Sequence, residues 1–454
     1  MNRLLVECTH VFKHPMVNSG IQRVVRNVIN QLPASAEGIE CMPVVVLNGQ
    51  LYRVLQLAPL NTPFFNKLEN FGERLERLAH RLCQWHQRRD AQCTSKLTRR
   101  ILYVGYRLTS FGAFGLQLRL IRRINRSQLL KRCTPLQHQP GDQLVLLDSS
   151  WHSDFFAQVE RLKRDGVGVI AVIYDLIPLT HPQFYESRLV GVFSEWFDWI
   201  TRTADGYMAI SATVRDQLRE ELKYRIGTER TDKCWFDFFH LGSELDLRNT
   251  EGTVEPRLKQ VFMTTDPVFL MVSTIEPRKN HAYLLDAFER AWAAGSTARL
   301  CIAGQIGWKC DALLARVSNH PQLNRRLFMF NGLSDTSLEH AYAHASALVF
   351  PSFVEGFGLP LVEAMQRGLP AMGSDIAVFR EIAGEFMAYF DLQDPQSLAD
   401  LINGFQRSGK FPAARDVADW QWIGWREASL QLVERSVRNI VGARATPIRR
   451  RARA

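Results

Sequence analysis

Residues 351–363, PSFVEGFGLPLVE, place two glutamates, Glu355 and Glu363, on either side of a glycine-rich loop. The run SALVFPS that leads into this stretch is mainly apolar, which is typical of a buried strand. Pro360 stands where a helix can begin, because the first residues of a helix have N–H groups without helical partners. We therefore expect the loop to join a parallel strand to a helix at the carboxyl edge of a sheet, where open α/β sheets bind ligands.

The composition of this loop predicts a binding site for a phosphorylated ligand. Gly356 and Gly358 leave backbone N–H groups uncovered at the positive end of a helix, where phosphate or sugar oxygens bind. Glu363, about one turn into the helix, can point back over the same edge, and a carboxylate is the usual partner of a ribose diol. Glu355 would face whatever is attached beyond the phosphates. Alternatively, Glu355 is a solvated loop acid and Glu363 only complements the helix dipole, but the complete string favours the binding site.

The same alternation of strand, loop and helix occurs twice along the chain, which indicates two doubly wound units. Continuous apolar strands that alternate with helices imply a parallel sheet covered on both faces. A chain of 454 residues also exceeds what one hydrophobic core usually serves, so two domains of roughly 200 residues each are expected. The expected strands of the first series are LLV (4–6), QLVLLDSSW (143–151), VGVIAVIYD (167–175) and GYMAIS (206–211). Those of the second series, beyond a polar junction near residues 245–266, are PVFLMVSTI (267–275), ARLCIAG (298–304), RLFMFNG (326–332), SALVFPS (346–352) and LPAMGSD (369–375).

Basic residues are concentrated in one segment and in the tail. Residues 67–132 hold 16 Lys and Arg against 4 acids, a net charge of +12, whereas the whole chain carries +10. Leu, Ile and Phe on one stripe and Arg on the other predict amphipathic helices in this segment. An Arg-rich solvated insertion and a contact with a membrane surface or another anionic partner explain the pattern equally well. The tail from Arg444 to Arg453 contains five more arginines.

The composition argues against several other classes of protein. With 46% hydrophobic and 22% charged residues, the chain is ordinary globular protein. Its 8 cysteines are scattered without a C-x-x-C pair or histidines at zinc spacing, so we expect free thiols and neither a metal site nor a disulfide framework. We find no apolar window of about 18 residues and no signal peptide, and therefore expect a cytosolic chain.

The string around Glu355 and Glu363 resembles the C-terminal domain of retaining GT-B glycosyltransferases of family 4 (glycosyl transferases group 1), whose mark is E-x7-E. The stretches that resemble the nucleotide-side loops of that family are VSTIEPRKN (272–280), the phosphate-binding turn, with CIAGQ (301–305) and NGLS (331–334). SGIQRVVR (19–26) and YDLIP (174–178) resemble a first loop and helix and a mid-domain strand end of a polysaccharide-building, mannosyltransferase-like subgroup. Together these stretches cover most of the chain except residues 60–135.

The resemblance implies an α/β chain with the GT-B architecture, in which two Rossmann-like doubly wound domains face each other across a cleft. An N-terminal acceptor domain would cover residues 1–250, with the basic helical insertion at about 60–135. A C-terminal nucleotide-sugar donor domain would cover residues 251–420. Residues 421–441 would form a helix that crosses back to the first domain, and 442–454 a basic tail. The active cleft then lies between the domains, and closure is expected.

The implied activity is transfer of a hexose from a nucleotide diphosphate sugar, GDP-mannose by subgroup resemblance, with retention at the anomeric carbon. The leaving diphosphate must be neutralised, and because the chain lacks the D-x-D triplet common in metal-dependent transferases, we expect neither a metal nor a cofactor. Arg278 and Lys279 are then the candidate phosphate clamp, the alternative being surface charge at a helix start. The expected acceptor is a growing, lipid-linked glycan of a bacterial capsule, O-antigen or exopolysaccharide. Such an enzyme would work at the inner face of the cytoplasmic membrane, with the Arg-rich insertion on anionic lipid.

The resemblance also implies roles for individual residues. Glu363 would bind the ribose, Glu355 a hydroxyl of the donor sugar, and Leu333 the base through its backbone. Gly20 would approach the diphosphate from the first domain, although a simple loop glycine is an equally good explanation for it. The amides that would hold the sugar and diphosphate belong to Gly356, Phe357, Gly358 and Leu359. The candidate catalytic residues are Glu355, Arg278, Lys279 and Asp175. A front-face displacement, in which the departing phosphate oxygen helps to take the acceptor proton, needs no enzymic nucleophile.

Three further residues are candidates for the acceptor side: Asp148, Trp151 and His181. Two of them have a structural alternative, because a histidine beside a proline is more often structural and a buried tryptophan is equally plausible. The chain also departs from the family here, since Tyr174 stands where many relatives carry a histidine just before the acidic residue that corresponds to Asp175.

Two other functions fit the same fold. A sugar-nucleotide epimerase would convert its substrate without an acceptor. A non-catalytic nucleotide or nucleic-acid binder is suggested by the basic charge. The basic residues, however, cluster outside the expected cleft and lack interleaved aromatic residues on strands, so we expect no specific nucleic-acid partner.

Overall fold

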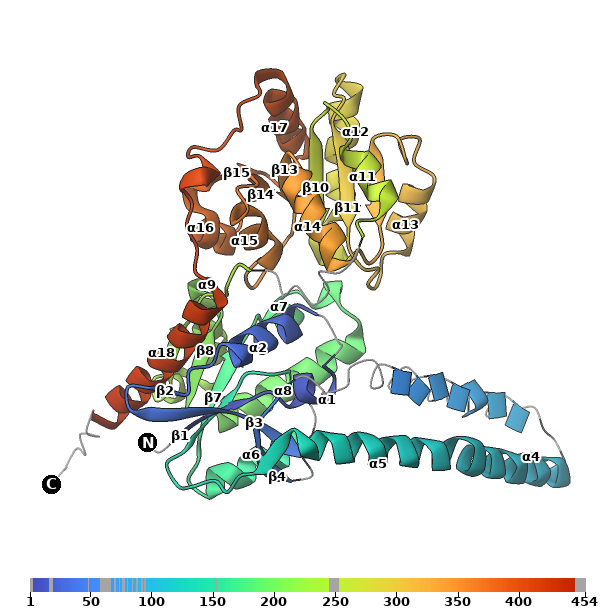
Figure 1. The fold of residues 1–454 in the computed structure, drawn as a ribbon, viewed down its shortest axis with the longest axis vertical. Coiled ribbons are helices and arrows are strands. Elements are labelled where there is room, and N and C mark those ends of the chain that lie inside the picture. The colour runs from blue at the N-terminus through green and yellow to red at the C-terminus, as the bar shows by residue number, and fades with distance from the viewer. Residues whose placement is uncertain are drawn as a thin grey trace.

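The structure, a computed structural model, describes residues 3–445 apart from 16–18, 48, 58–66, scattered positions between 69 and 94, 150, 152 and 245–252. Two domains, each built on one sheet, lie one above the other in Figure 1. The chain passes between them twice, once after the first sheet and once before the last helix. The expected domain boundary at residues 250 and 251 lies outside the described residues.

The first domain is built on a nine-stranded sheet. Its strands are β1 (Arg3–Glu7), β2 (Ser35–Ala36), β3 (Ile39–Leu47), β4 (Gln50–Val54), β5 (Cys133–Pro135), β6 (Gln143–Leu146), β7 (Gly168–Ile173), β8 (Gly206–Ala209) and β9 (Trp235–Phe238). Six of them pair parallel: the four expected strands and, in addition, β3 and β9. The strands β2, β4 and β5 pair antiparallel. The connection from β3 to β4 is too short for a crossover, so only an antiparallel strand can follow it. Strand order reverses between β1 and β6, which places a ligand crevice at their carboxyl ends.

The second domain is built on a wholly parallel sheet of six strands in the order β12-β11-β10-β13-β14-β15. They are β10 (Val268–Val272), β11 (Arg299–Ala303), β12 (Leu327–Phe330), β13 (Ala347–Phe350), β14 (Ala371–Ser374) and β15 (Met387–Phe390). The five strands predicted from the sequence are confirmed, and β15 is an additional one. Strand order reverses between β10 and β13, so the loops that follow these two strands flank a second ligand crevice.

Helices cover both sheets, as the continuous apolar strands predict. In β10, Leu270 packs into one apolar cluster and Phe269 and Met271 into another on the opposite face, and a parallel sheet needs such cover on both faces. The helices of the first domain are α1 (Thr9–Lys13), α2 (Gly20–Asn30), α6 (Ser153–Arg164), α7 (Ile177–Thr180), α8 (Ser187–Thr203), α9 (Ala212–Ile226) and α10 (Thr228–Thr231). Those of the second are α11 (Pro256–Phe262), α12 (His281–Ala293), α13 (Asp311–Ser318), α14 (Asp335–His344), α15 (Leu359–Met365), α16 (Ala377–Ala383) and α17 (Pro395–Ser408).

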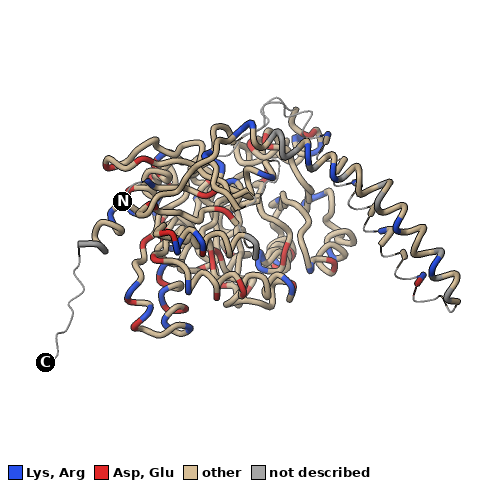
Figure 2. The backbone as a smooth tube through the Cα atoms, turned by 90° about the horizontal axis from the view of Figure 1, so that it is seen from below, with Lys and Arg blue, Asp and Glu red and all other residues tan. Residues whose placement is uncertain are grey.

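A long helical arm projects from the first domain (Figure 1). It consists of α4 (Lys96–Leu108), a π-helical stretch (Thr109–Gly115) and α5 (Leu116–Lys131), and in Figure 2 blue Lys and Arg positions mark its length. Arg132 anchors its base, because Nη2 donates to the carbonyl oxygen of Phe12 at 3.0 Å and the guanidinium lies over the Phe12 ring. The arm leaves several large apolar side chains exposed: Leu97, Tyr103, Val104, Leu108, Leu116 and Leu120.

The last helix, α18 (Trp425–Ala445), packs against α2 and β9 of the first domain. It begins four residues later than the sequence predicts, because the carboxylate of Glu244 accepts a hydrogen bond from the backbone N–H of Trp425 at 2.9 Å and caps the helix there. Residues 446–454 of the basic tail lie outside the described residues. Across the part of the chain that the structure describes, no helix is both long and apolar enough to cross a membrane. All 8 cysteines are free thiols, as expected.

Candidate active site

The loop between β13 and α15 follows the carboxyl edge of the second sheet, where strand order reverses. Gly358 has a φ of +112°, and a Cβ there would lie 2.9 Å from Cε1 of Phe379, so this position needs glycine. Pro360 lies in the first turn of α15, as expected. Glu355 and Glu363 are buried, with exposed fractions of 8% and 1%. The alternative that Glu355 is a solvated loop acid is therefore wrong.

Glu355 binds both of the predicted phosphate-clamp cations. Its Oε2 accepts from Nη1 of Arg278 at 2.6 Å, and its Oε1 accepts from Nζ of Lys279. Both cations belong to a 3-10 turn, Pro277–Lys279, which follows β10, and Nη2 of Arg278 also pairs with Glu276 at 2.7 Å. Burial raises the pKa of the Glu355 carboxyl, but the two cations outweigh it and lower this pKa to about 2. The surface-charge alternative for Arg278 and Lys279 is wrong, because Lys279 is buried and Arg278 is largely buried.

Asp175 joins this cluster from the first domain. It follows β7, and its Oδ1 accepts from the N–H of Ile177 at 3.0 Å. Burial away from water raises the pKa of its carboxyl, while the positive charge of Arg278 opposes the shift. Gly356 lies directly against the same strand end, because a Cβ on it would be 2.2 Å from the carbonyl oxygen of Tyr174 and 3.0 Å from Cβ of Asp175. The predicted catalytic residues therefore meet across the interface between the two domains.

Glu363 has two partners that the sequence did not suggest. Its Oε1 accepts from Nη2 of Arg23, in α2 of the first domain, and its Oε2 accepts from the hydroxyl of Tyr342, in α14, at 2.9 Å. The only available signal was that Arg23 lies in the string that resembles a family loop. Because Arg23 is 340 positions away from Glu363, no local pattern could have paired the two residues.

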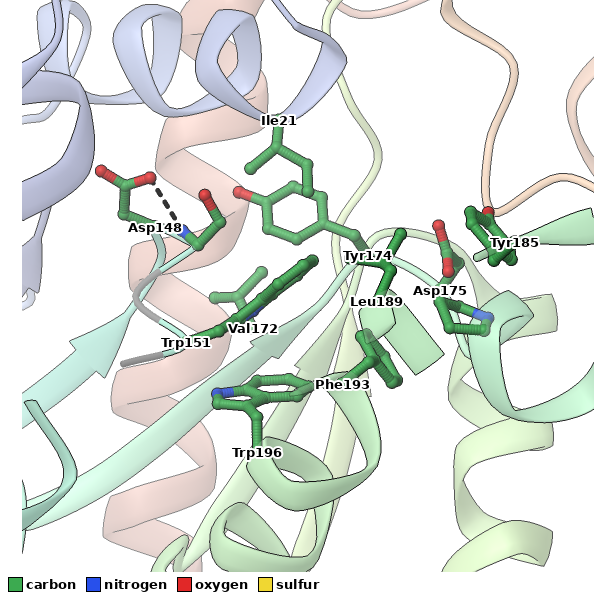
Figure 3. Close-up of a pocket in the computed structure, with 12 residues that line it drawn as sticks. Ile21, Asp148, Trp151, Val172, Tyr174, Asp175, Tyr185, Leu189, Phe193 and Trp196 are labelled. Carbon is green, nitrogen blue, oxygen red and sulfur yellow. Dashed lines mark hydrogen bonds between the residues drawn. The ribbon is translucent and has the colours of Figure 1, made fainter. Parts of the chain in front are cut away.

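A mainly apolar cavity of about 150 Å³ opens beside Asp175 at the carboxyl edge of the first sheet (Figure 3). Its wall includes the aromatic residues Trp151, Tyr174, Tyr185, Phe193 and Trp196. The rings of Trp151 and Phe193 meet edge to face, with centroids 5.4 Å apart. Of the residues around this cavity, only Trp151 and Asp148 were predicted acceptor residues. Phe193 and Trp196 were missed because they come from α8, whose apolar side chains follow an ordinary core pattern. Aromatic faces next to a carboxylate suit a polyhydroxylated ring, which presents both C–H and O–H groups.

Of the other two acceptor candidates, Asp148 lies at the cavity and His181 does not. Asp148 borders the cavity, but its Oδ2 accepts from the N–H of Val11 at 2.7 Å and its Oδ1 from the N–H of Ser149 at 2.7 Å. In Figure 3 its carboxylate points away from the Trp151 ring, so Asp148 holds the start of α1. His181 is not among the residues that form the cavity wall. Its ring stacks on the ring of Phe184, with centroids 5.9 Å apart.

The loop after β11 forms a second contact between the domains, next to the cavity wall. Nε1 of Trp308 donates to the carbonyl oxygen of Phe184 at 2.8 Å, and Nζ of Lys309 donates to that of Gln183 at 3.0 Å. The Trp308 ring also stacks on Tyr185, with centroids 5.7 Å apart. Residues of the donor side thus support one wall of the cavity.

The remaining predicted donor-site residues lie near the carboxyl edges of the two sheets, but none has a contact that tests its role. Gly20 is the first residue of α2, and a Cβ on it would meet open space. Leu333 follows β12 and is partly buried. Phe357 is buried near the rings of His240 and Trp422. Among the described residues, no group of three His, Cys, Asp or Glu side chains is arranged to hold a metal ion.

Comparison with known proteins places these features in context. Residues 255–416 match the family model described as Glycosyl transferases group 1. The chain is 32% identical to the serotype-specific mannosyltransferase WbdA of Escherichia coli over 304 residues, 65% of this chain and 37% of that protein. It is 24% identical to the O-antigen chain mannosyltransferase B of Escherichia coli over 324 residues, 69% of this chain and 82% of that protein. This chain therefore spans little more than a third of the length of WbdA.

Solved structures show the same fold over nearly the whole chain. Sucrose-phosphate synthase from Thermosynechococcus elongatus superposes with a TM-score of 0.53 and 16% identity, covering 98% of this chain and 100% of that one. Alr3699/HepE of Anabaena, in complex with UDP, gives a TM-score of 0.53 and 12% identity, again covering 98% of this chain and 100% of that one. The predicted GT-B fold is confirmed, and residues 255–416 match glycosyl transferases group 1, as the motifs of the second domain suggested.

Proposed function

We propose that this chain is a retaining glycosyltransferase, and the match of residues 255–416 to glycosyl transferases group 1 supports the proposal. It would move a hexose from a nucleotide diphosphate sugar to a growing glycan in bacterial surface polysaccharide synthesis. The observation that carries this proposal is the cluster of Glu355, Arg278, Lys279 and Asp175. The cluster lies between the domains, at the sheet edges where open α/β folds bind ligands, and it borders a cavity fit for a sugar ring.

The proposed chemistry needs charge stabilisation more than a nucleophile. As the glycosidic bond breaks, the diphosphate gains charge, and fixed cations in an enclosed site stabilise it. Arg278 and Lys279 supply these cations without a metal ion, while the ionised Glu355 can accept a hydrogen bond from a hydroxyl of the donor sugar. Retention follows if the acceptor hydroxyl attacks from the face that the diphosphate leaves, with the departing oxygen taking its proton.

We further propose that the donor is GDP-mannose. Support comes from the relatives, since WbdA and the O-antigen chain mannosyltransferase B are both named mannosyltransferases. UDP-sugars remain in the test because HepE was crystallised with UDP. In the bound state Glu363 would exchange Arg23 or Tyr342 for the ribose hydroxyls.

A panel of GDP- and UDP-sugars tests this function by thermal shift and calorimetry, using the wild type, Glu363→Ala and Glu363→Gln. We expect GDP-mannose to stabilise the wild type selectively and to bind both variants at least tenfold more weakly, because a hydrogen bond to a charged group contributes about 1.5–3 kcal/mol. Glu385→Gln, which changes an exposed acid of the same domain, should bind like the wild type. If no sugar nucleotide stabilises the folded protein, the transferase proposal fails. Conversion of the sugar nucleotide without an acceptor would indicate an epimerase instead.

We also propose that the acceptor is lipid-linked and that the arm holds the enzyme at the inner face of the cytoplasmic membrane. Two features of α4 and α5 support this. Exposed apolar side chains such as Leu108 and Leu120 can enter the boundary between lipid headgroups and acyl chains. The exposed Arg107, Arg119 and Arg123 complement the negative charge of such a surface.

Binding to vesicles tests the arm. Replacing Arg107, Arg119 and Arg123 by glutamine should weaken binding to vesicles that contain phosphatidylglycerol by on the order of a hundredfold, because each basic residue near an anionic surface contributes about 1 kcal/mol. Added salt should weaken the binding of the wild type in the same assay. Replacing three exposed arginines elsewhere in the first domain, Arg202, Arg219 and Arg230, is the matched control and should leave it intact. Equal binding of wild type and arm variant would contradict the proposal.

A further inference from the structure

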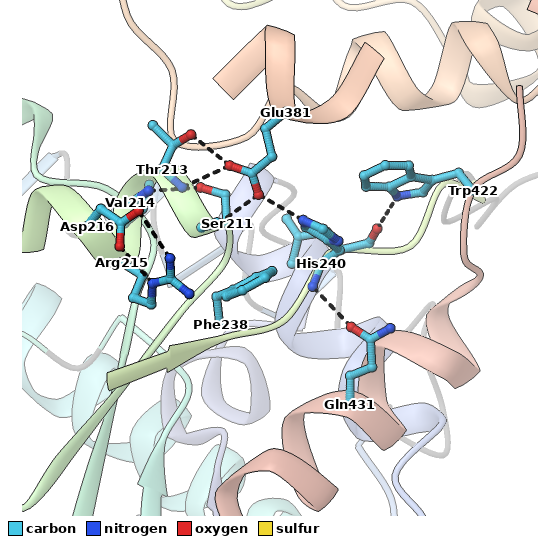
Figure 4. Close-up of polar contacts among 12 residues, drawn as sticks. Ser211, Thr213, Val214, Arg215, Asp216, Phe238, His240, Glu381, Trp422 and Gln431 are labelled. Carbon is cyan, nitrogen blue, oxygen red and sulfur yellow. Dashed lines mark hydrogen bonds and ion pairs between the residues drawn. The ribbon is translucent and has the colours of Figure 1, made fainter. Parts of the chain in front are cut away.

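One carboxylate of the second domain makes all of its hydrogen bonds to the first domain. Glu381 lies in α16, and its Oε1 accepts from the N–H of Ala212 at 2.7 Å and from Nε2 of His240 at 2.8 Å. Its Oε2 accepts from the N–H of Thr213 at 2.8 Å and from the Thr213 hydroxyl at 2.7 Å. Figure 4 shows this carboxylate between the start of α9 and the His240 ring. Four donors therefore converge on a single side chain that belongs to the other domain.

The partner of Glu381 is the positive end of a helix. The first N–H groups of a helix lack intrahelical acceptors, and the helix dipole favours a negative charge there. The hydroxyl oxygen of Ser211, the N-cap of α9, accepts from the N–H of Val214 at 3.1 Å. Glu381 accepts hydrogen bonds from two further N–H groups of the same turn, those of Ala212 and Thr213. Burial raises the pKa of the Glu381 carboxyl, but these hydrogen bonds outweigh it and lower this pKa to about 2. The group is thus a carboxylate at neutral pH.

The same helix end touches the loop that carries the candidate catalytic residues. The Ser211 hydroxyl donates to the carbonyl oxygen of Gly356 at 3.0 Å. Gly356 in turn lies against the backbone of Tyr174, next to Asp175. Glu381 and the glycine-rich loop therefore dock on neighbouring positions of one rigid element, the start of α9.

His240 extends this contact to the segments that connect the domains. It follows β9 in the stretch that leaves the first domain, and its ring lies 4.9 Å from that of Trp422, in the stretch that returns from the second. Nε1 of Trp422 donates to the carbonyl oxygen of Leu241 at 2.8 Å. Glu381 thus binds where both connections pass.

We propose that Glu381 is a positioning residue, which holds the second domain against the start of α9 so that the Gly356 loop meets Asp175. The assignment of a donor loop rests on the proposed function, whereas the contact between the domains does not. Loss of the carboxylate would leave the N–H groups of Ala212 and Thr213 to water and allow the domains to separate. Glu355, Arg278 and Lys279 would then move away from Asp175 without any change in their own contacts.

The test uses the full chain, with small-angle X-ray scattering and steady-state kinetics on Glu381→Ala, Glu381→Gln and Thr213→Val. We expect Glu381→Ala to have a larger radius of gyration than the wild type without ligand, and a KM for the sugar nucleotide that is at least tenfold higher. Turnover at saturating donor should largely recover, because bound donor can restore the closed arrangement. Glu381→Gln, which keeps one acceptor oxygen and places a donating NH2 at the other position, should lie between wild type and alanine, and Thr213→Val should have a smaller effect. Glu385→Gln is the control and should match the wild type.

An unchanged radius of gyration in Glu381→Ala would overturn the inference, because the carboxylate would then not hold the domains together. An unchanged KM would overturn it as well, and a lower turnover beside an unchanged KM would indicate ordinary structural damage. If the wild type transfers no sugar, the proposed function fails but the scattering result still decides whether Glu381 holds the domains together.

Discussion

Replacing Glu355 by glutamine is expected to lower turnover by on the order of a thousandfold and to destabilise the second domain. Removing one partner of a buried ion pair costs about 3–5 kcal/mol, because the remaining charge stays buried without compensation. Glu355 binds two such partners, Arg278 and Lys279. Loss of its charge also releases both cations from the positions in which they would meet the diphosphate. The loss of one preorganised donor alone typically lowers turnover by a factor of about 100 to 1,000. Denaturant unfolding and turnover under saturating donor measure the two effects.

The pH dependence of stability gives this prediction a second readout. The pKa of Glu355 is lowered from its ordinary value of 4.5 to about 2. Its contribution is therefore fully present above pH 4.5 and is lost as the pH falls toward 2. We expect the difference in unfolding free energy between wild type and Glu355→Gln to shrink over this window. Asp375→Asn removes one half of an exposed ion pair with Arg380 in the same domain and should cost less than about 1 kcal/mol. An equally small cost for Glu355→Gln would show that the buried cluster does not form.

Adding one methyl group at Gly356 is expected to impair catalysis while both domains stay folded. A Cβ at this position would lie 2.2 Å from the carbonyl oxygen of Tyr174, which belongs to the backbone of the other domain. Since neither backbone can yield easily, the domains must separate instead. Overpacking of this kind costs typically about 1–3 kcal/mol, which corresponds to a fall in kcat/KM of roughly fivefold to 150-fold. Kinetics and scattering on Gly356→Ala would register the fall and the separation together.

Gly191→Ala is the matched control for this substitution. Gly191 lies in α8, and a Cβ on it would meet no atom within 4 Å, so this variant should be as active as the wild type. Normal kinetics and an unchanged radius of gyration for Gly356→Ala would mean that the loop does not rest on the end of β7 in the working enzyme. The closed arrangement of the cluster around Asp175 would then need revision.

The second domain was largely predictable because its signals are local. The apolar run before residue 351, the glycines at 356 and 358 and Pro360 all act within a few residues of chain, and they yield the strand, loop and helix that the structure contains. The antiparallel strands β4 and β5 were not predicted, since their pairing depends on a short connection and on Cys133 returning from beyond the arm. Arg278 and Lys279 were expected to face phosphate, and the structure adds that Glu355 holds them.

By itself, therefore, the sequence determined the two doubly wound α/β domains, the two loops that flank the second crevice and the residue types those loops carry. These features follow from periodicity, glycine conformation and helix starts, which are properties of neighbouring residues. Only the tertiary structure decided which charges meet. Arg23 reaches Glu363 across 340 positions, and Glu381 caps α9 across 168 and 169 positions. Such pairs depend on how two separately folded domains dock, and the interaction of two charges depends on their distance in space, not on their separation along the chain.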